Sequence, residues 1–367
     1  MSTDTLTHDP STQPVAAGSA TGCNIAPPVP ARLAQLFRPR GVHCDAPHPL
    51  LPLLRAYRDR PGTAHPPAQP PTAAAVATAL TTPADPPDIS ALTRRITALP
   101  PLPEAMTEVL LALSRSQLSA KRSIELIEHD PALAARTLRL ANSAFYGVPG
   151  RVACIGDAVR ILGLRTVAGV LAAVAVHNTV RIESCPGFHF QAYWQHAIAT
   201  ALTARTLAPI AGHDADEAFL AALMHDIGQL ALAAFYPNHA SAALALARHH
   251  DLPAQQAEQT VLGIAHPQVG ALLAAHWRLP PPIVRAIAHH HAPEPASPGQ
   301  RLSLSGLVQV ADAVAHALDL SADPHEAVPT IAAAVWQALG LQPDTALRMF
   351  EAVERGTQEI SAMLHQT

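Results

Sequence analysis

Histidine and aspartate residues recur in an ordered series through the second half of this 367-residue chain. The series is His196, His225, Asp226, His266, His290, His291 and Asp312. Imidazole nitrogens and carboxylate oxygens together bind divalent metal ions, which can activate water for the hydrolysis of phosphoesters. A single histidine would be weak evidence, because the chain contains 21 of them. The ordered series predicts a metal site built from all seven residues, with a divalent ion of undetermined element as the cofactor.

His225 and Asp226 lie in an apolar stretch, where an unpaired carboxylate is costly to bury. The pair therefore needs partners, and two arrangements meet that need. In the first, a metal ion neutralises Asp226. In the second, His225 and Asp226 form a metal-free polar network with His196 and Asp312, which fixes the order of the helices. The residue types leave both arrangements open.

Helical periodicity predicts the elements that must position these side chains. Asp214 followed by Glu217 resembles a capping box, and the helix after it, from 215 to about 235, is apolar almost all round. We expect it to be the buried central helix, with His225 and Asp226 inside it. Later helices are predicted at about 238–250, 254–264, 267–277, 281–290, 302–319, 327–339 and 344–364.

Further helices are predicted upstream of the histidines. Apolar residues within 102–113 recur at the spacing of one helix face. Asp130 and Pro131 then combine an N-cap acceptor with a proline at the first helical position. We expect the helix that they start to carry Leu140 on its buried stripe. Two more helices should follow, the second ending near residue 180.

The composition limits both fold and function. Hydrophobic residues make up 49% of the chain but aromatic residues only 4%, and alanine and leucine supply most of the apolar mass. This bias favours an all-α fold over a sheet. The net charge of −4 and the lack of a basic face argue against nucleic-acid binding.

Localisation is predicted from the apolar runs and the N-terminus. The longest apolar run, 167–176, is far shorter than the roughly 20 residues that a membrane span needs. The N-terminus is polar and acidic, unlike a signal peptide. We therefore expect a cytoplasmic protein without membrane contact.

Residues 1–89 hold about half of the 36 prolines and are rich in alanine and threonine. So many missing backbone N–H groups cannot sustain helices, and we predict a disordered leader. Its removal should leave the stability of the domain unchanged. One apolar island, 48–57, interrupts this segment. The island is either a short helix that docks a partner or an apolar patch that packs on the domain.

Longer sequence blocks resemble a known family. The segments DPALAARTLRLANSAFYG, DEAFLAALMHDIGQLAL and VLGIAHPQVGALLAAHWRLP are similar to those of HDOD domains, relatives of the HD superfamily of metal-dependent phosphohydrolases. The resemblance implies one all-α HDOD domain of two packed helical lobes at 90–320, with a helical extension at 321–367. It also implies a non-enzymatic module of bacterial signalling that acts through a protein partner, in an undetermined oligomeric state.

The chain departs from the catalytic relatives of this family. HD-GYP phosphodiesterases follow their double histidine with glutamate and a Gly-Tyr-Pro stretch, whereas His291 here is followed by Ala292 and Pro293. The position after the HDIG motif, where a cation could hold a phosphate, is Gln229. The candidate ligands are nevertheless all present. A metal-dependent phosphohydrolase acting on a nucleotide is therefore the alternative function.

Overall fold

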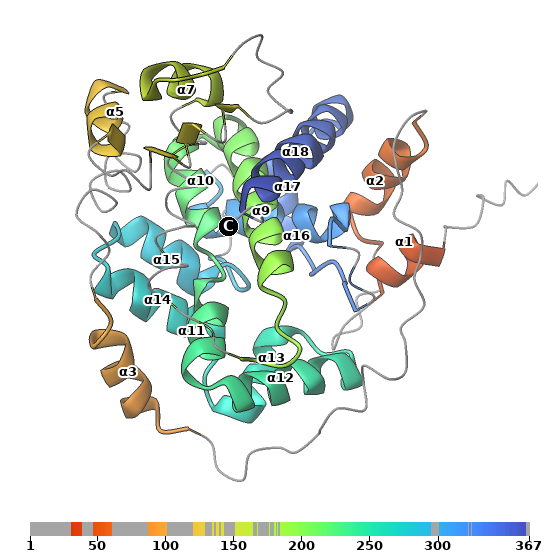
Figure 1. The fold of residues 1–367 in the computed structure, drawn as a ribbon. Coiled ribbons are helices and arrows are strands. Elements are labelled where there is room, and N and C mark those ends of the chain that lie inside the picture. The colour runs from red at the N-terminus through yellow and green to blue at the C-terminus, as the bar shows by residue number, and fades with distance from the viewer. Residues whose placement is uncertain are drawn as a thin grey trace, which may run out of the picture.

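The computed structural model is built from helices, and no strand occurs among the residues that it describes (Figure 1). These residues are 31–38, 47–60, 87–100, 120–128, 151–163, 184–294, 301–321 and 325–364, with isolated positions between 134 and 182 and at 323. The predicted all-α fold is confirmed. In chain order the helices are α1 (Ala31–Leu36), α2 (Leu50–Arg58), α3 (Ile89–Thr97), α5 (Ala120–Glu128), α7 (Ile155–Leu162), α9 (Phe190–Ala211), α10 (Ala215–Leu223), α11 (Ile227–Phe235), α12 (Pro237–His250), α13 (Ala254–Leu262), α14 (His266–His276), α15 (Pro281–His289), α16 (Leu304–Leu318), α17 (Ala333–Leu339) and α18 (Pro343–Leu364).

The core is formed by α9 and the helices around it. Helix α9 contacts α10, α16 and α18, while α14 contacts α11 and α15. Buried alanines line α9, and their small side chains let the neighbouring helices approach closely. Helix α10 begins at the predicted N-cap, because the Asp214 carboxylate accepts the backbone N–H groups of Asp216 and Glu217.

Helices α5 and α7 contact each other and lie at one end of the molecule, near α10 in Figure 1. They come from the first half of the predicted domain, and α9 to α16 come from the second. The helix predicted at 102–113 lies outside the described residues, and so does Leu140. The helix predicted from Asp130 is described only at isolated positions from 134 to 142, most of which are helical.

The apolar stretch 215–235 is not the single helix that its sequence predicts. Helix α10 ends before a turn at 224–226, and α11 begins after it. The prediction that His225 and Asp226 lie inside a continuous helix is therefore wrong. Successive residues of a helix point about 100° apart, whereas in this turn His225 Nε2 lies 3.4 Å from Asp226 Oδ2. The break lets two neighbouring residues serve one site.

A close backbone approach positions α11 against α14. A Cβ atom at Gly228 would lie 2.0 Å from the His266 carbonyl oxygen and 2.7 Å from the backbone nitrogen of Gly270. Both neighbours are backbone atoms, which cannot rotate away as a side chain can. Only glycine allows this contact, and the contact places His266 beside Asp226.

We expect Gly228→Ala to destabilise the fold by more than about 2 kcal/mol, because overpacking against backbone forces two helices apart. The gain in helix propensity, about 1 kcal/mol, offsets only part of this cost. Chemical denaturation measures the difference. The matched control is Gly156→Ala, whose Cβ would meet only the Ile124 Cδ1 atom at 4.0 Å. A stability equal to that of the wild type would contradict the close approach.

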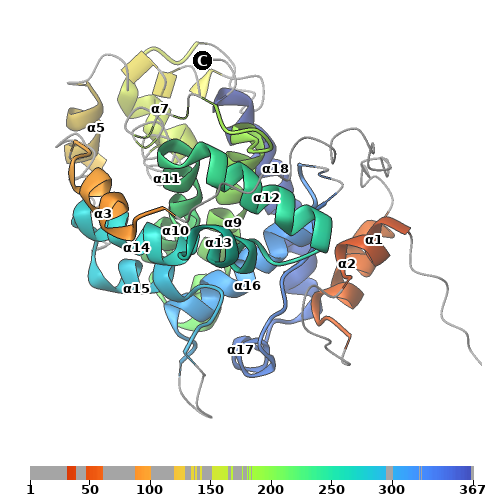
Figure 2. The same cartoon turned by 90° about the horizontal axis from the view of Figure 1, so that it is seen from below.

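Helices α1 and α2 pack on the domain, which corrects part of the leader prediction. Five of their side chains are each at most 3% exposed: Leu33, Leu36, Leu50, Leu54 and Tyr57. Figure 2 shows both helices beside the C-terminal part of the chain, and α2 contacts α16 and α18. The predicted disorder is wrong for residues 31–38 and 47–60, which we call the N-terminal strap, because their side chains complete the core. The apolar island packs on the domain, one of its two interpretations.

Two polar contacts also hold the strap to residues that lie much later in the chain, at separations of 287 and 297 positions. Arg32 Nε donates to Asp319 Oδ2 at 2.7 Å, and the Tyr57 hydroxyl donates to Glu354 at 2.6 Å. We therefore expect loss of the strap to destabilise the domain, contrary to the expectation from composition. The other residues up to 86 lie outside the described part of the chain.

Among the described residues, one helical stretch, Ala215–Phe235, has the length and hydropathy of a membrane span. Its most apolar window has a mean hydropathy of 1.5, and 83% of that window is buried inside the domain. The apolar character is therefore that of core helices, which meet other helices on all sides.

Candidate metal centre

All seven predicted residues meet at one place in the fold. They come from α9 (His196), the turn after α10 (His225 and Asp226), the start of α14 (His266), the end of α15 (His290 and His291) and the middle of α16 (Asp312). Five of them are buried: His225, Asp226, His266, His290 and Asp312. Their role as metal ligands stays a prediction, which the following geometry supports.

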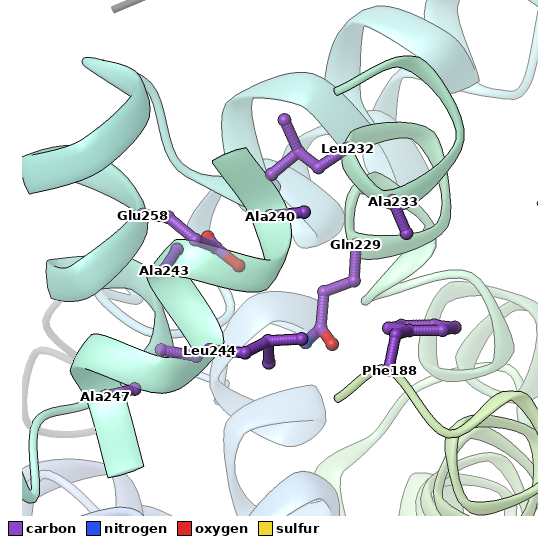
Figure 3. Close-up of a pocket in the computed structure, with 10 residues that line it drawn as sticks. Phe188, Gln229, Leu232, Ala233, Ala240, Ala243, Leu244, Ala247 and Glu258 are labelled. Carbon is purple, nitrogen blue, oxygen red and sulfur yellow. The ribbon is translucent and has the colours of Figure 1, made fainter. Parts of the chain in front are cut away.

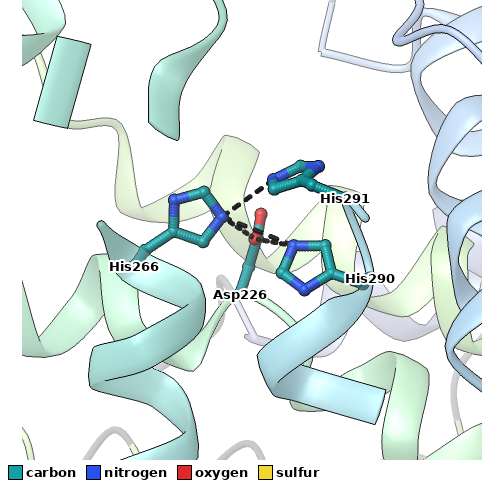
Figure 4. Close-up of side chains that lie close together, drawn as sticks. All are labelled: Asp226, His266, His290 and His291. Carbon is teal, nitrogen blue, oxygen red and sulfur yellow. Dashed lines mark hydrogen bonds and ion pairs between the residues drawn. The ribbon is translucent and has the colours of Figure 1, made fainter. Parts of the chain in front are cut away.

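Asp226 lies at the middle of a first group of donor atoms (Figure 4). Its Oδ1 atom lies 3.1 Å from His266 Nε2 and 3.5 Å from His290 Nε2. His291 Nε2 lies 3.0 Å from His266 Nε2. All four donors lie within 4.8 Å of one another. Asp226 Oδ1 is nevertheless buried without a well-directed hydrogen bond among the described residues.

A second group of donors lies on the other side of Asp226. His196 Nε2 lies 3.0 Å from Asp312 Oδ1 and 3.3 Å from His225 Nε2. The other carboxylate oxygen of Asp226, Oδ2, lies 3.4 Å from His225 Nε2 and 4.0 Å from His196 Nε2. Asp226 thus presents one oxygen to each group, as a carboxylate shared between two ions would.

The imidazole rings are held with their Nε2 atoms facing inward. His225 Nδ1 lies 2.7 Å from the Ala222 carbonyl oxygen, and His290 Nδ1 lies 2.8 Å from that of Ile287. A carbonyl only accepts, so each Nδ1 carries the proton and the neutral ring keeps a lone pair on Nε2. Proteins orient metal-binding histidines in this way, through a hydrogen bond at the nitrogen that does not bind the metal.

These distances test whether a metal ion fits. Lone pairs of neighbouring Nε2 atoms repel each other and the Asp226 carboxylate unless a proton or a metal ion lies between them. Ligands about 2.1 Å from one ion lie about 3.0–3.4 Å apart in octahedral or tetrahedral sites. The closest contacts of both groups, 3.0 to 3.4 Å, match this spacing. The donor set therefore fits a metal ion.

The buried charges of the site balance one another. Burial raises the pKa of Asp226, but His225 and His266 outweigh it and hold that pKa well below its usual range. Burial lowers the pKa of His266, but Glu258 and Asp226 reverse the effect and raise it to about 10. Burial also lowers the pKa of His290, which keeps this ring in the neutral form that binds metals. The buried carboxylates therefore require a cation, either protons or a metal.

Two positioning residues were missed by the sequence analysis. Glu258 Oε2 accepts both the backbone N–H and the Nδ1–H of His266, each at 2.7 Å, so it caps α14 and orients this ring. His316 Nε2 lies 3.2 Å from Asp312 Oδ1. His316 follows Asp312 by four residues on one helix, a spacing that places both on the same face and could have identified it. Glu258 has no such signal in the sequence.

Gln229 directly follows the HDIG motif, at the position where a cationic side chain could hold a phosphate. Its Nε2 donates to Asp226 Oδ2 at 2.7 Å, so the side chain orients the carboxylate. Behind it lies a small apolar pocket between α11 and α12, of about 20 Å³, lined mainly by alanine and leucine (Figure 3). This volume holds about one water molecule. The pocket therefore offers no place for a phosphate.

A larger cleft, of about 830 Å³, opens onto both groups of donors. On its inner side are six residues of the centre: His196, Asp226, His266, His291, Asp312 and His316. Its outer walls are the strap, with Phe37, Arg38 and His48, and the segment 321–337, with Asp323, Glu326 and Trp336. The strap and the segment 321–337 therefore form part of the walls of the cleft that leads to the centre.

Comparison with known proteins identifies the family. The sequence matches the HDOD domain over residues 99–293, more than half of the chain. The chain belongs to the HDOD family. The match contains His196, His225, Asp226, His266 and the double histidine, whereas Asp312, α16 and the strap lie outside it.

Among curated proteins, an uncharacterised protein of Treponema pallidum is 27% identical to this HDOD protein over 237 residues. The alignment covers 64% of this chain and 45% of the relative, so the chain spans less than half of that relative's length.

Solved structures show the same fold. A candidate phosphohydrolase from Shewanella amazonensis is 27% identical with a TM-score of 0.58, and the match covers 75% of this chain and 98% of that one. A candidate signal-transduction protein from Marinobacter aquaeolei is 26% identical with a TM-score of 0.64, covering 76% and 65%. An HDOD domain protein of unknown function from Geobacter sulfurreducens, 22% identical with a TM-score of 0.54 and covering 76% and 94%, shares the fold alone.

Proposed function

We propose that this HDOD protein is a metal-binding module of cytoplasmic signal transduction that acts through a protein partner. The observation that carries the proposal is a cluster of histidine and aspartate donors at the base of a cleft whose described lining has no unpaired cation. Arg38 is the only arginine or lysine in that lining, and it is bound to Asp251 and to the carbonyls of Gln35 and Glu326. The set would hold a metal, and the cleft would grip a phosphate poorly.

The residues of the centre divide into two roles. The buried His225, His266 and His290 would hold the metal with Asp226 and Asp312. His196 and His291 are partly exposed toward the cleft. A divalent metal bound there would supply Lewis acidity toward an oxygen ligand entering from the cleft. Asp323 and Glu326 on the outer wall would repel a free phosphate.

One observation favours hydrolysis of a phosphoester as the second candidate function. The cleft reaches both donor groups, which gives a substrate access to the positions that a metal would occupy. The similarity to the candidate phosphohydrolase of Shewanella amazonensis agrees with this reading. Gln229 and the missing cation argue against it, because transition-state charge on a phosphoryl group needs positive partners beyond the metal.

The test is turnover by the metal-loaded protein. We expect no release of phosphate from p-nitrophenyl phosphate and no cleavage of cyclic di-GMP above the background of Asp226→Ala. Metal-dependent hydrolysis by the wild type that Asp226→Ala abolishes would instead establish the second candidate.

The partner proposal has its own test. Asp226→Asn keeps the size of the side chain and removes its charge inside the centre. Proteins that co-purify with the wild type from its native cell should be retained by this variant when its circular dichroism is unchanged, since a buried centre and a binding surface are separate. If neither the wild type nor Asp226→Asn retains a partner, the proposal is contradicted.

A further inference from the structure

His316 extends the second donor group beyond the predicted residues. Its Nε2 atom lies 3.2 Å from Asp312 Oδ1, and its ring centroid lies 4.3 Å from that of His196. The donors of His196, Asp312 and His316 all lie within 4.8 Å of one another. His316 is partly exposed and lines the cleft.

The other ring nitrogen of His316 is held by a carboxylate. Its Nδ1 atom lies 2.5 Å from Glu326 Oε1. A carboxylate at Nδ1 directs the Nε2 lone pair to a metal, as Glu258 does for His266. His316 therefore has the same arrangement as His266, with Glu326 in the role of Glu258.

Glu326 lies in the segment that holds the N-terminal strap. Arg38 Nη1 donates to the Glu326 carbonyl oxygen at 2.9 Å, and Arg38 Nη2 donates to the His325 carbonyl oxygen at 3.3 Å. Two residues on, Val328 N–H donates to the Leu36 carbonyl oxygen at 2.7 Å. The strap therefore fixes the backbone that carries Glu326, and Glu326 fixes His316.

We propose that His316 is an additional metal ligand, shared with His196 and Asp312, and that metal binding there stabilises the docking of the N-terminal strap. The inference rests on the proposed metal binding. An ion that needs His316 in place favours the conformation in which Glu326 orients it, and this conformation includes the docked strap. Linkage is reciprocal, so a docked strap must strengthen metal binding by the same factor.

Undocking of the strap would change access to the metal centre. Its outer walls are the strap and the segment 321–337, so an undocked strap would open the centre to solvent. Loss of the metal would then expose the apolar faces of α1 and α2.

Titration of the EDTA-treated full chain with Mn²⁺ tests the first half of the proposal. Bound Mn²⁺ is followed by electron paramagnetic resonance and by mass spectrometry of the metal. We expect His316→Ala to weaken one bound ion at least tenfold. The control His249→Ala removes an exposed histidine of α12 and should bind as the wild type does.

Hydrogen exchange of the peptide covering 31–38 tests the second half. Mn²⁺ should slow exchange there at least threefold in the wild type and leave it unchanged in His316→Ala. Arg38→Ala removes the contacts of the strap with 325–326 and with Asp251, and it should weaken the same ion. If His316→Ala fails to fold, Glu326→Gln and Arg38→Ala carry the test, because neither alters a candidate ligand.

The outcomes separate the two proposals. Full Mn²⁺ stoichiometry and affinity in His316→Ala and Glu326→Gln would overturn the inference and leave the proposed metal-binding function standing. Exchange at 31–38 that does not respond to bound Mn²⁺ in the wild type would overturn the coupling. A wild type that binds no Mn²⁺, Zn²⁺ or Fe²⁺ would overturn the proposed metal-binding function, and the inference with it.

Discussion

Replacing Asp226 with alanine should remove most of the metal that the wild type carries. Asp226 contributes Oδ1 to the group containing His266 and Oδ2 to the group containing His225, so its loss affects both at once. A lost partner outside the ligand set commonly costs 10–100-fold in affinity, and a lost ligand shared by two groups should cost at least about 100-fold. Elemental analysis of the purified protein measures the change.

The control for this experiment is Asp344→Ala, which removes an exposed carboxylate at the start of α18. It should keep the metal content of the wild type. Asp226→Ala leaves the buried imidazoles of His225 and His266 without their carboxylate partner and should lower stability, so circular dichroism must show that the variant is folded before its metal content is compared. Equal metal content in both variants would contradict the assignment of Asp226 as a ligand. A metal-free wild type would favour the polar-network alternative.

Truncating Leu54 in the strap should destabilise the whole domain by about 2–5 kcal/mol, the usual range for a buried leucine. Leu54 is fully buried on α2, next to Tyr57, whose ring packs edge-on against Phe350 of α18 at 5.4 Å. For a domain of this size, such a loss lowers the melting temperature by at least about 5 °C. Calorimetry on Leu54→Ala measures it.

A matched control separates packing from side-chain type. Leu272 on α14 is 40% exposed, so Leu272→Ala should change stability by less than about 0.5 kcal/mol. Deletion of residues 1–60 should lower the melting temperature further than Leu54→Ala, because it uncovers α16 and α18 together. An unchanged melting temperature after that deletion would restore the view of this segment as a passive leader.

Much of the fold and the candidate site follows from local sequence. Asp214 marks the start of α10 because an N-cap is a contact between residues two or three apart. The seven candidate ligands could be named because histidine and aspartate recur in order through a largely apolar sequence. Their convergence follows from the resemblance to the HDOD family and could not be derived from periodicity.

Other features depend on contacts that local sequence does not encode. The apolar residues on both sides of His225 and Asp226 gave no sign of a helix break at 224–226, which lies beside the close approach of Gly228 to α14. Glu258 reaches His266 across the loop between α13 and α14, at no helical spacing. The prediction of disorder for the strap was wrong because the proline content indicates only how the segment would behave in isolation. In the folded protein, Leu50 and Leu54 pack against helices from the far end of the chain.

The long separation between the strap and its partners has a consequence for biosynthesis. Arg32 leaves the ribosome long before Asp319, and Tyr57 long before Glu354, with 287 and 297 positions between the members of each pair. Closing such long loops is slow, and contacts of this kind form late in folding. During nearly all of translation, the apolar faces of α1 and α2 therefore lack the surfaces that cover them, and they are open to chaperones and proteases. The finished protein should seal these faces in its last folding step.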